Sequence, residues 1–461
     1  MTEFQKKSFR DPSGFVIIEG DRVYRAIKKD IASNYRELFL EAWYLKLVED
    51  GKIQRSIWVE SESLDKQFDW VEHPKFVFPL FPHEICAEQL YESALLTIEI
   101  AQIAFENGYI LKDASAWNVV FDQGSPIFCD VTSFEVYDKK SLWHAYGQFC
   151  RHFIIPLLLY KYLKISPAQL FLSYRDGVPP AQARKMLGYR ALFNGAAIET
   201  VYLPAYLESS RSQKNSAKEG AGAHIGDKIY KDMLTRLGGY VRKLRPFNQI
   251  SKSTWSDYEA ERAHYSESDL DEKQVFVNEA LRMCPPSGSV LDLGCNQGEY
   301  SLLAAGLGLK TVATDFDETA LIKLQARSKS EGVSVGLLNI CQPTPAIGWN
   351  NEEQRSFLDK SKGHFDLVLC LGLIHHLLMT ERIPLNQVCD FLLRLTKQYL
   401  LIEWVDSEDE KFQQISLFSQ DLYRDLTQHN FESMIGKKFK IINKKSLIKA
   451  RRTFYLLEKI S

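Results

Sequence analysis

The residues with the clearest chemical potential lie in the segment SVLDLGCNQG, residues 289–298, which is followed directly by EYSLLAA. A short apolar run ends there in two glycines, Gly294 and Gly298, and a helix-like segment begins immediately afterwards. Glycine lets the backbone turn sharply and approach a ligand that a Cβ would keep away. The N–H groups and positive dipole at the start of the next helix favour a carboxylate or a phosphate. The pattern predicts a strand–turn–helix ligand site in an open α/β sheet.

Asp292 narrows the class of ligand at this turn. The order of residues is D-x-G-x-x-x-G, and not the G-x-G-x-x-G that packs a pyrophosphate against a helix. An acidic side chain before the first glycine would repel a pyrophosphate. It suits the ammonium of a methionine moiety, whose carboxylate can take the amides of the turn. A nucleotide site of the dehydrogenase type is the alternative.

The ends of the next strands supply groups for an adenosine. In a doubly wound sheet the ligand lies across the carboxyl ends of the strands. Asp315 follows Asp292 by 23 residues, at the end of the second strand, where a carboxylate can accept both hydroxyls of a ribose. Asn339 is placed to hydrogen-bond the edge of an adenine, and Phe316 and Ile340 to enclose the base. These residues fit any cofactor that contains adenosine.

Four segments in this order carry a resemblance to a known family. LDLGCNQGEYSL, VATDFD, FDLVLCLGLIHHL and the final pair of strands resemble class I S-adenosylmethionine-dependent methyltransferases, from roughly residue 255 to the C-terminus. The resemblance implies a seven-stranded sheet with a reversed last strand. It assigns Asp292, Gly294 and Gly298 to the methionine part of S-adenosylmethionine and Asp315 to its ribose, and it adds Asn296 of the same turn to the cofactor-binding residues.

One position departs from the family, because Asn339 stands where the family often has Asp at the adenine. With LKDASAWN upstream and PTPAIGW and HHL downstream, the arrangement also resembles bacterial nodulation-associated methyltransferase-like proteins. The resemblance does not identify the acceptor. A small molecule, a saccharide or a protein all remain open, and a non-catalytic S-adenosylmethionine-binding regulator is a further alternative.

Methyl transfer from a sulfonium needs in-line positioning and, for a hydroxyl or amine acceptor, a base. His375 and His376 follow the fourth strand, and an imidazole there could take the acceptor's proton near neutral pH. Adjacent residues point in different directions, so at most one of them is expected to be catalytic, and structural roles for both are the alternative. Glu403, at the end of the fifth strand, is the other candidate base or else an ionic partner inside the sheet. Trp255 and Tyr258 either close over the cofactor or pack as aromatics.

A second constellation lies in the N-terminal half, in LKDASAWN and PIFCD. The spacing of Asp113, Asn118 and Asp130 resembles the catalytic loop and metal-binding Asp of kinase-like phosphotransferases. In such a site Asp113 would orient a hydroxyl, and Asn118 and Asp130 would hold the Mg²⁺ of Mg-ATP. Lys28 and Glu41 would then belong to a reduced nucleotide lobe. No glycine-rich loop precedes Lys28, so a turn-rich structural loop and a substrate-recruiting module without chemistry are the alternatives.

The positions of these groups depend on an alternating series of strands and helices that begins near residue 268. The last two strands are joined by a loop too short for a parallel crossover, so they are expected to be antiparallel. The predicted fold class is α/β, a doubly wound seven-stranded Rossmann-like sheet preceded by an α+β domain with kinase-like features. The predicted strands are Ser289–Cys295, Lys310–Phe316, Val333–Ile340, Phe365–Gly372, Gln398–Val405, Phe439–Asn443 and Arg452–Lys459, and a long helix, Ser419–Met434, precedes the last pair.

The N-terminal half has less regular signals. A hairpin is predicted over Gly14–Lys29, a long helix over Asn34–Glu49, and further helices over Leu90–Glu106 and Trp143–Leu163, the last interrupted by Pro156. Residues 207–226 are polar and rich in Gly, Ala and Ser, which is typical of a linker. We therefore divide the chain into an N-terminal domain (1–206), a linker and helical connector (207–250) and a methyltransferase domain (251–461).

The overall composition gives no signal for several classes of function. The 461 residues carry a net charge of −2, so no overall basic footprint marks a nucleic-acid or anionic-membrane binder. The eight cysteines form no CxxC pair, which favours free thiols over a zinc site. No apolar run approaches the roughly 20 residues that span a bilayer, and no secretory signal begins the chain. A cytoplasmic enzyme is expected, with the N-terminal domain binding or preparing the acceptor.

Overall fold

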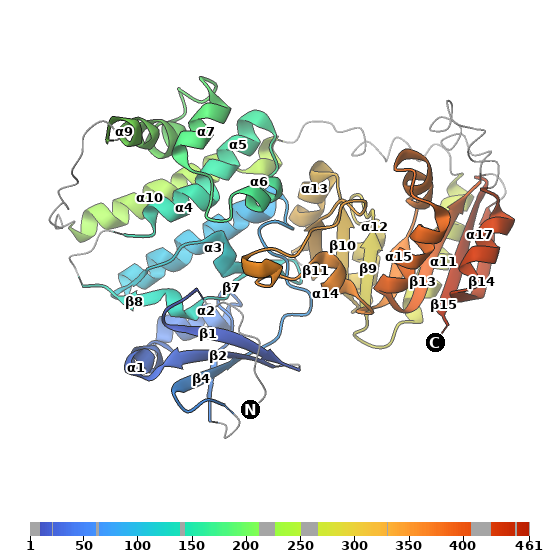
Figure 1. The fold of residues 1–461 in the computed structure, drawn as a ribbon, viewed down its shortest axis with the longest axis horizontal. Coiled ribbons are helices and arrows are strands. Elements are labelled where there is room, and N and C mark those ends of the chain that lie inside the picture. Colours follow the sequence, from blue (N-terminus) through green and yellow to red (C-terminus); the bar gives the residue numbers. More distant parts are fainter. Residues whose placement is uncertain are drawn as a thin grey trace. The chain divides into compact units, whose positions relative to one another are not determined.

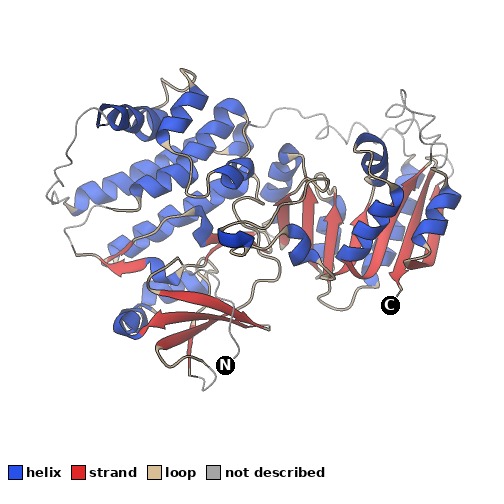
Figure 2. Cartoon of the chain, in the orientation of Figure 1, coloured by secondary structure: helices blue, strands red, loops and turns tan. Residues whose placement is uncertain are grey.

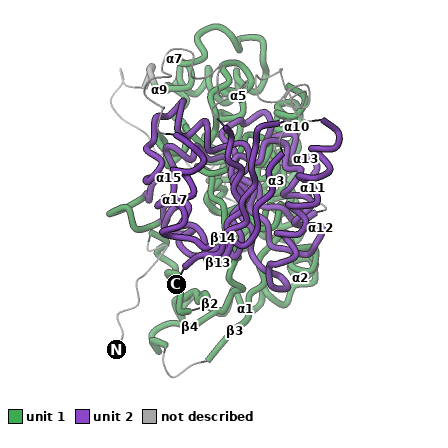
Figure 3. The backbone as a smooth tube through the Cα atoms, turned by 90° about the vertical axis from the view of Figure 1, so that its right-hand side faces the viewer, with its two compact units in different colours: residues 1–249, 348–353 green, residues 250–347, 354–461 purple. Residues whose placement is uncertain are grey.

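The computed structural model describes residues 10–20, 22–60, 64–138, 143–211, 226–249, 266–329, 331–406, 426–447 and 450–460. Trp255 and Tyr258 lie outside these residues. The chain forms two compact units, the first made of residues 1–249 and 348–353 and the second of residues 250–347 and 354–461 (Figure 3). No helix among the described residues is long and apolar enough to cross a bilayer.

The second unit is built on a seven-stranded sheet (Figures 1 and 2). Its order is β11-β10-β9-β12-β13-β15-β14, and only β15 runs against the others. This order places β9 beside both β10 and β12, so the carboxyl ends of these three strands meet at one edge. The predicted doubly wound sheet with one reversed strand is therefore confirmed. The strands are β9 (Ser289–Leu293), β10 (Lys310–Asp315), β11 (Val333–Leu337), β12 (Phe365–Cys370), β13 (Thr396–Val405), β14 (Phe439–Leu447) and β15 (Arg452–Lys459).

Helices cover this sheet and position the ends of its strands. The first begins at a capping box in which Ser266 and Asp269 satisfy each other's backbone N–H groups. Asp317 caps the helix that follows β10, because its carboxylate accepts from the N–H groups of Thr319 and Ala320. The helices are α11 (Glu267–Arg282), α12 (Glu299–Gly306), α13 (Glu318–Ser328), α14 (Phe357–Ser361), α15 (Leu385–Leu395) and α17 (Gln428–Ile435). Much of the predicted helix Ser419–Met434 lies outside the described residues.

The first unit begins with a four-stranded antiparallel sheet of order β1-β2-β4-β3. The predicted hairpin is present as β1 (Gly14–Glu19) and β2 (Arg22–Lys28), and β3 (Ile57–Val59) and β4 (Phe68–His73) complete the sheet. One prediction was wrong here, since the expected continuous helix over residues 34–49 is two helices. The rings of Phe39 and Tyr44 stack with their centroids 5.2 Å apart. Residues five apart lie on different faces of a continuous helix, so the chain bends to bury both rings. The helices are α1 (Lys29–Leu38) and α2 (Ala42–Glu49).

The rest of this unit is mainly helical. Its long helix α3 (Ala87–Glu106) packs against α10 (Asp227–Lys243), where the rings of Phe105 and Tyr230 stack 4.2 Å apart. α10 is therefore part of the first unit, although the sequence placed it in a connector. Pro156 lies in the first turn of α5, directly after a π-helical segment at 150–154. The other elements are β5 (Tyr109–Leu111), β6 (Val119–Asp122), β7 (Ser125–Phe128), β8 (Phe134–Val136), α4 (Tyr146–Phe149), α5 (Ile155–Leu163), α6 (Pro167–Ser173), α7 (Pro180–Leu187), α8 (Gly195–Ala197) and α9 (Leu203–Arg211).

A buried ion triad joins three elements of the second unit. Glu403 on β13 is fully buried, and it accepts from Lys273 of α11 over 3.0 Å and from Arg452 of β15 over 2.8 Å. A carboxylate in the interior is costly unless cations and hydrogen bonds satisfy it, and here both of its oxygens are engaged. The triad therefore holds the reversed strand and the first helix to the centre of the sheet.

We expect Glu403→Ala to destabilise the protein by about 3–5 kcal/mol, because it leaves two buried cations without their carboxylate. Chemical denaturation followed by far-UV circular dichroism measures this loss. Glu279→Ala is the matched control, because Glu279 lies exposed on the same helix as Lys273. An equal, small effect of both substitutions would contradict a structural role for the triad.

Candidate cofactor site

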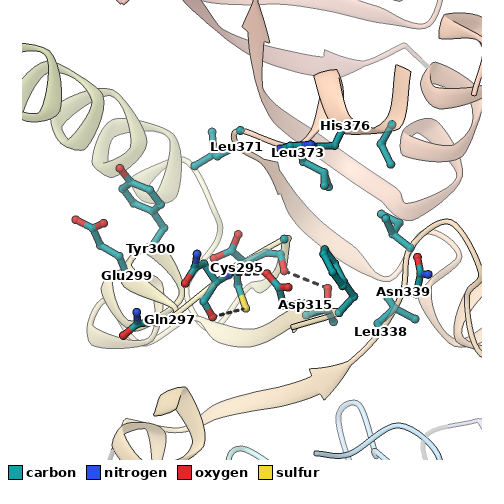
Figure 4. A pocket seen from close by; sticks show the side chains of 18 of the residues that line it. Cys295, Gln297, Glu299, Tyr300, Asp315, Leu338, Asn339, Leu371, Leu373 and His376 are labelled. Atoms are coloured by element: carbon teal, nitrogen blue, oxygen red, sulfur yellow. Dashed lines mark hydrogen bonds between the residues drawn. The ribbon is translucent and has the colours of Figure 1, made fainter. Parts of the chain in front are cut away.

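A cavity of about 700 Å³ opens at the carboxyl ends of β9, β10, β11 and β12 (Figure 4). The glycine turn forms one wall, and the residues after β12 form the opposite one. Seven of the eight residues predicted to bind the cofactor line it, and the eighth, Gly298, lies behind the turn against Leu324. The seven are Asp292, Gly294, Asn296, Asp315, Phe316, Asn339 and Ile340.

The turn takes its shape from left-handed backbone at three positions. Gly294 has φ +70°, Asn296 has φ +50° and Gly298 has φ +75°. A Cβ on Gly298 would collide with the Leu324 side chain, so glycine is required there for both conformation and space. Helix α12 then starts with its N-terminus directed at the turn.

Most amides of this turn are already engaged within the protein. The N–H groups of Gly294 and Cys295 donate to the carbonyl of Thr314 on β10, at 2.8 and 3.0 Å. Gly298 donates to the carbonyl of Cys295, and Asn296 donates to the Asp315 carboxylate. The expectation that a ligand carboxylate takes the turn amides therefore does not fit these four groups. A ligand carboxylate in this cavity would need other N–H groups of the turn or a cationic side chain.

Lys273 is a buried cation on the cavity wall that sequence reasoning missed. It reaches the cavity wall from α11 while it also donates to Glu403. The signal was present, since Lys273 is a charged residue three and four positions before Phe276 and Val277 on the buried face of the helix. Other wall residues that were not predicted are Cys295, Gln297, Glu299, Tyr300, Leu302, Thr314, Arg327, Leu338, Cys341, Leu371, Gly372, Leu373, Leu377, Thr380 and Glu381.

Asp292 is a buried acid on this wall. Its carboxylate accepts from the Ser301 hydroxyl over 2.6 Å. Burial raises the pKa of Asp292 to about 6, and the nearby Asp315 adds to the shift while Ser301 and Lys273 oppose it. The side chain is thus ionised at neutral pH but close to taking up a proton, which makes its charge sensitive to a cationic ligand.

Asp315 holds the turn and faces the cavity. One oxygen accepts from the N–H of Asn296 over 2.8 Å, and the other accepts from the N–H of Asp317 over 2.9 Å. Burial raises its pKa, and these two hydrogen bonds oppose that shift. Phe316 next to it is exposed, and Asn339 accepts from the N–H of Cys341 over 3.0 Å.

The three candidate bases occupy different environments. His376 lines the cavity, whereas His375 is buried behind it, with the ring centroids 4.1 Å apart. Of the two adjacent histidines, only His376 is among the residues that line the cavity. Glu403 does not line the cavity, since both of its oxygens are held by Lys273 and Arg452. His376 is the candidate that the geometry favours.

Asp113, Asn118 and Asp130 of the N-terminal unit also lie in one hydrogen-bonded network, but the cation in it is Arg25. Asp130 accepts from Arg25 Nη1 over 2.9 Å, and the hydroxyls of Thr132 and Ser133 lie 2.7 and 2.6 Å from its two oxygens. Burial alone would raise the pKa of Asp130, but Arg25 and these hydroxyls outweigh burial and lower it. Both oxygens of Asp130 thus accept hydrogen bonds within the protein.

The other members of this constellation are tied to the same network. Asn118 donates to the backbone carbonyl of Asp113 and to the Ser133 hydroxyl. Asp113 accepts from the N–H of Ser115 over 3.0 Å, and its pKa is raised by burial and by the charge of Asp130. Within the described residues no three His, Cys, Asp or Glu side chains are grouped to hold a metal ion. In this arrangement the cation paired with Asp130 is Arg25.

The nucleotide lobe also differs from the sequence interpretation. Lys28 ends β2 and is exposed, and Glu41 is exposed before α2. No ion pair joins these two described residues. Arg25 is the inward-facing cation of β2 instead, because alternate residues of a strand point to opposite faces and Lys28 lies three positions along.

Comparison with known proteins defines the class. Residues 265–434 match the model of a methyltransferase domain. The second unit is an S-adenosylmethionine-dependent methyltransferase domain, and the protein is an S-adenosylmethionine-dependent methyltransferase. Along almost its whole length the chain is similar to the nodulation protein NoeA of Rhizobium meliloti, with 29% identity over 98% of this chain and 95% of that protein.

Other similarities are more local. An uncharacterized methyltransferase of Schizosaccharomyces pombe is 30% identical over 22% of this chain and 63% of its own length. Among solved structures, the magnesium protoporphyrin IX methyltransferase of Synechocystis PCC 6803 with bound S-adenosylhomocysteine has 14% identity and a TM-score of 0.29, covering 50% of this chain and 99% of that one. The bifunctional kinase-methyltransferase WbdD has 19% identity and a TM-score of 0.30, covering 42% and 40%.

The pKa of Asp292 generates a pH prediction. If the ionised Asp292 carboxylate holds the cofactor's ammonium, the affinity for S-adenosylhomocysteine should fall as the pH drops below about 6, by about tenfold per pH unit. Isothermal titration calorimetry across this pH range measures the affinity.

In the cofactor-free protein the pH dependence of stability has the opposite sign. The contribution of the raised Asp292 pKa to the free energy of unfolding is full below pH 3.8 and is lost as the pH rises through about 6. Asp292→Asn should bind weakly with a flat profile, and tight binding by this variant would contradict the assignment.

Proposed function

We propose that the cavity holds S-adenosylmethionine with its amino-acid end between Asp292 and Lys273. The methionine moiety is a zwitterion, and it needs one anion for its ammonium and one cation for its carboxylate. Asp292 and Lys273 supply these opposite charges on the wall of one cavity. This pairing is the observation that carries the proposal. A pyrophosphate would meet the Asp292 carboxylate and a turn with most of its amides engaged.

The remaining contacts follow from the order of the strands. Asp315 at the end of β10 accepts the ribose hydroxyls, and the adenine lies by Phe316, Asn339 and Ile340. Asn339 stands where the family often has Asp. An ionised carboxylate can only accept hydrogen bonds, whereas the Asn339 amide can both donate to the base and accept from it. The sulfonium then lies between the amino-acid part and the adenosine part of the cofactor, on the side of the residues that follow β12.

His376 serves as the base of the transfer. The acceptor's oxygen or nitrogen attacks the methyl carbon in line with the carbon–sulfur bond. The electrons of that bond stay on sulfur, which becomes the thioether of S-adenosylhomocysteine, and His376 takes the acceptor's proton. His376 suits this role because it lines the cavity next to Leu373 and Leu377, which exclude water from the reacting atoms.

His376→Ala should leave the affinity for S-adenosylhomocysteine within about twofold while lowering transfer by about 10²–10⁴-fold. The measurement is transfer of a labelled methyl group from S-adenosylmethionine into fractionated small-molecule, saccharide and protein pools of the source cell. His375→Gln is the control, because His375 is buried behind the wall. Unchanged transfer by His376→Ala would remove it as the base. No transfer into any pool by the unaltered protein would favour a regulator that binds the cofactor without turnover.

We infer that the N-terminal unit binds the acceptor and does not transfer a phosphoryl group. The Arg25 guanidinium supplies positive charge where Mg²⁺ would bind, and Asp113 and Lys112 remain partly accessible beside it. A bifunctional protein with an ATP-dependent N-terminal unit is the second candidate. The gathering of Asp113, Asn118 and Asp130 in one network supports it.

Thermal denaturation with added ligands separates the two candidates. S-adenosylhomocysteine should raise the melting temperature, and Mg-ATP and NAD should not. Stabilisation by Mg-ATP that disappears in Asp130→Ala would support the bifunctional protein. In that case Arg25→Met, which frees the Asp130 carboxylate, should change the apparent affinity for Mg-ATP, with Arg36→Met as a control at an exposed pair with Asp69.

A further inference from the structure

Seven large apolar side chains are exposed on neighbouring elements of the N-terminal unit. They lie on α9, on the π-helical segment before it, and on the loop after α7, and these elements contact one another. Figures 1 and 3 both show α7 and α9 side by side. We name this surface the α7–α9 patch, and it consists of Tyr189, Leu192, Phe193, Ile198, Leu203, Tyr206 and Leu207.

The helical part of the patch presents one face. Leu203, Tyr206 and Leu207 are spaced i, i+3 and i+4, so they share a side of α9. Ile198 begins the π-helical segment that precedes α9. Because hydrogen bonds in a π-helix join residues five apart, Ile198 lies about one turn before Leu203. All four of these side chains are exposed. α9 and the π-helical segment before it therefore present apolar side chains to solvent.

The loop part of the patch places aromatic rings in solvent. Gly188 ends α7 in a left-handed conformation, and Tyr189 directly after it is 87% exposed. Phe193 is fully exposed four residues later. The Tyr202 hydroxyl donates to the carbonyl of Gly188 over 2.9 Å, which fixes this loop beside the segment that leads into α9. A buried interior would have been the ordinary place for these rings, so their exposure indicates a surface that binds.

Basic residues flank the rings. Arg184, Lys185 and Arg190 are exposed, and no ion pair to a described residue is found for them. The acidic residues between positions 180 and 208 are Glu199, which is engaged by Arg236, Tyr146 and Tyr240, and Glu208, which is exposed next to Leu207 on α9. The patch therefore combines local positive charge with exposed apolar rings. The net charge of −2, averaged over the whole chain, hides this local charge.

We propose that the α7–α9 patch binds the surface of an anionic phospholipid bilayer. Leucine and aromatic side chains insert at the boundary of headgroups and acyl chains, and arginine and lysine beside them attract anionic lipids. Tyrosine prefers this interface because its ring is apolar and its hydroxyl stays hydrated. A second copy of the chain fits less well, because a two-fold contact would bring the three cations close to their own copies.

Co-sedimentation of the full chain with lipid vesicles tests the proposal. The protein should pellet with vesicles of phosphatidylcholine and phosphatidylglycerol, much less with pure phosphatidylcholine, and less as salt is raised. The double variant Tyr189→Ser, Phe193→Ser should reduce partitioning at least about tenfold, because two inserted rings are lost. The triple variant Arg184→Gln, Lys185→Gln, Arg190→Gln should reduce it at least about tenfold as well.

Leu40→Ser is the matched control, because Leu40 is an exposed apolar residue of the same unit outside the patch. It should leave partitioning unchanged, and none of these exposed substitutions should alter the circular dichroism spectrum. Three results would overturn the proposal: no sedimentation with anionic vesicles, equal sedimentation of all variants, or concentration-dependent self-association that Tyr189→Ser, Phe193→Ser abolishes. The last result would assign the patch to a second copy of the chain.

Discussion

The cofactor site depends on one carboxylate, that of Asp315. By accepting from the N–H groups of Asn296 and Asp317, it joins the glycine turn after β9 to the start of the helix after β10. The carbonyl of Thr314, one residue earlier, receives two further N–H groups of the turn. These bonds hold Asn296 in a left-handed conformation that Asn tolerates better than most residues. Without them the turn would have no fixed shape for a ligand.

Charge in the second unit is organised around the same edge of the sheet. Lys273 stands between two acids, since it donates to Glu403 in the core and also lowers the pKa of Asp292 on the cavity wall. The triad that stabilises the sheet thus also orients a cation of the proposed cofactor site. A similar ion pair occurs in the N-terminal unit, where Arg25 on β2 donates to Asp130 in the turn after β7. In both units an acid, fully buried for Glu403 and partly buried for Asp130, pairs with a cation that is distant in sequence.

Much of the fold and most of the proposed cofactor residues could be predicted from the sequence. Parallel strands end at one edge, so Asp292, Asp315 and Asn339 could be placed together from strand ends alone. The failures have a common physical cause. The place of Lys273, and the choice between the two roles considered for Glu403, depend on which helix packs over which strand, and local patterns do not encode that. Arg25 was overlooked for Lys28 because only the register of β2 in its sheet decides which side chain faces inward.

The most direct measurement of the central claim is a crystal structure of the protein with S-adenosylhomocysteine. The account predicts the amino-acid end of the ligand between Asp292 and Lys273, the ribose at Asp315, and the sulfur facing the side of the cavity that carries His376. Ligand density elsewhere in the molecule, or an amino-acid end turned away from Asp292, would contradict it.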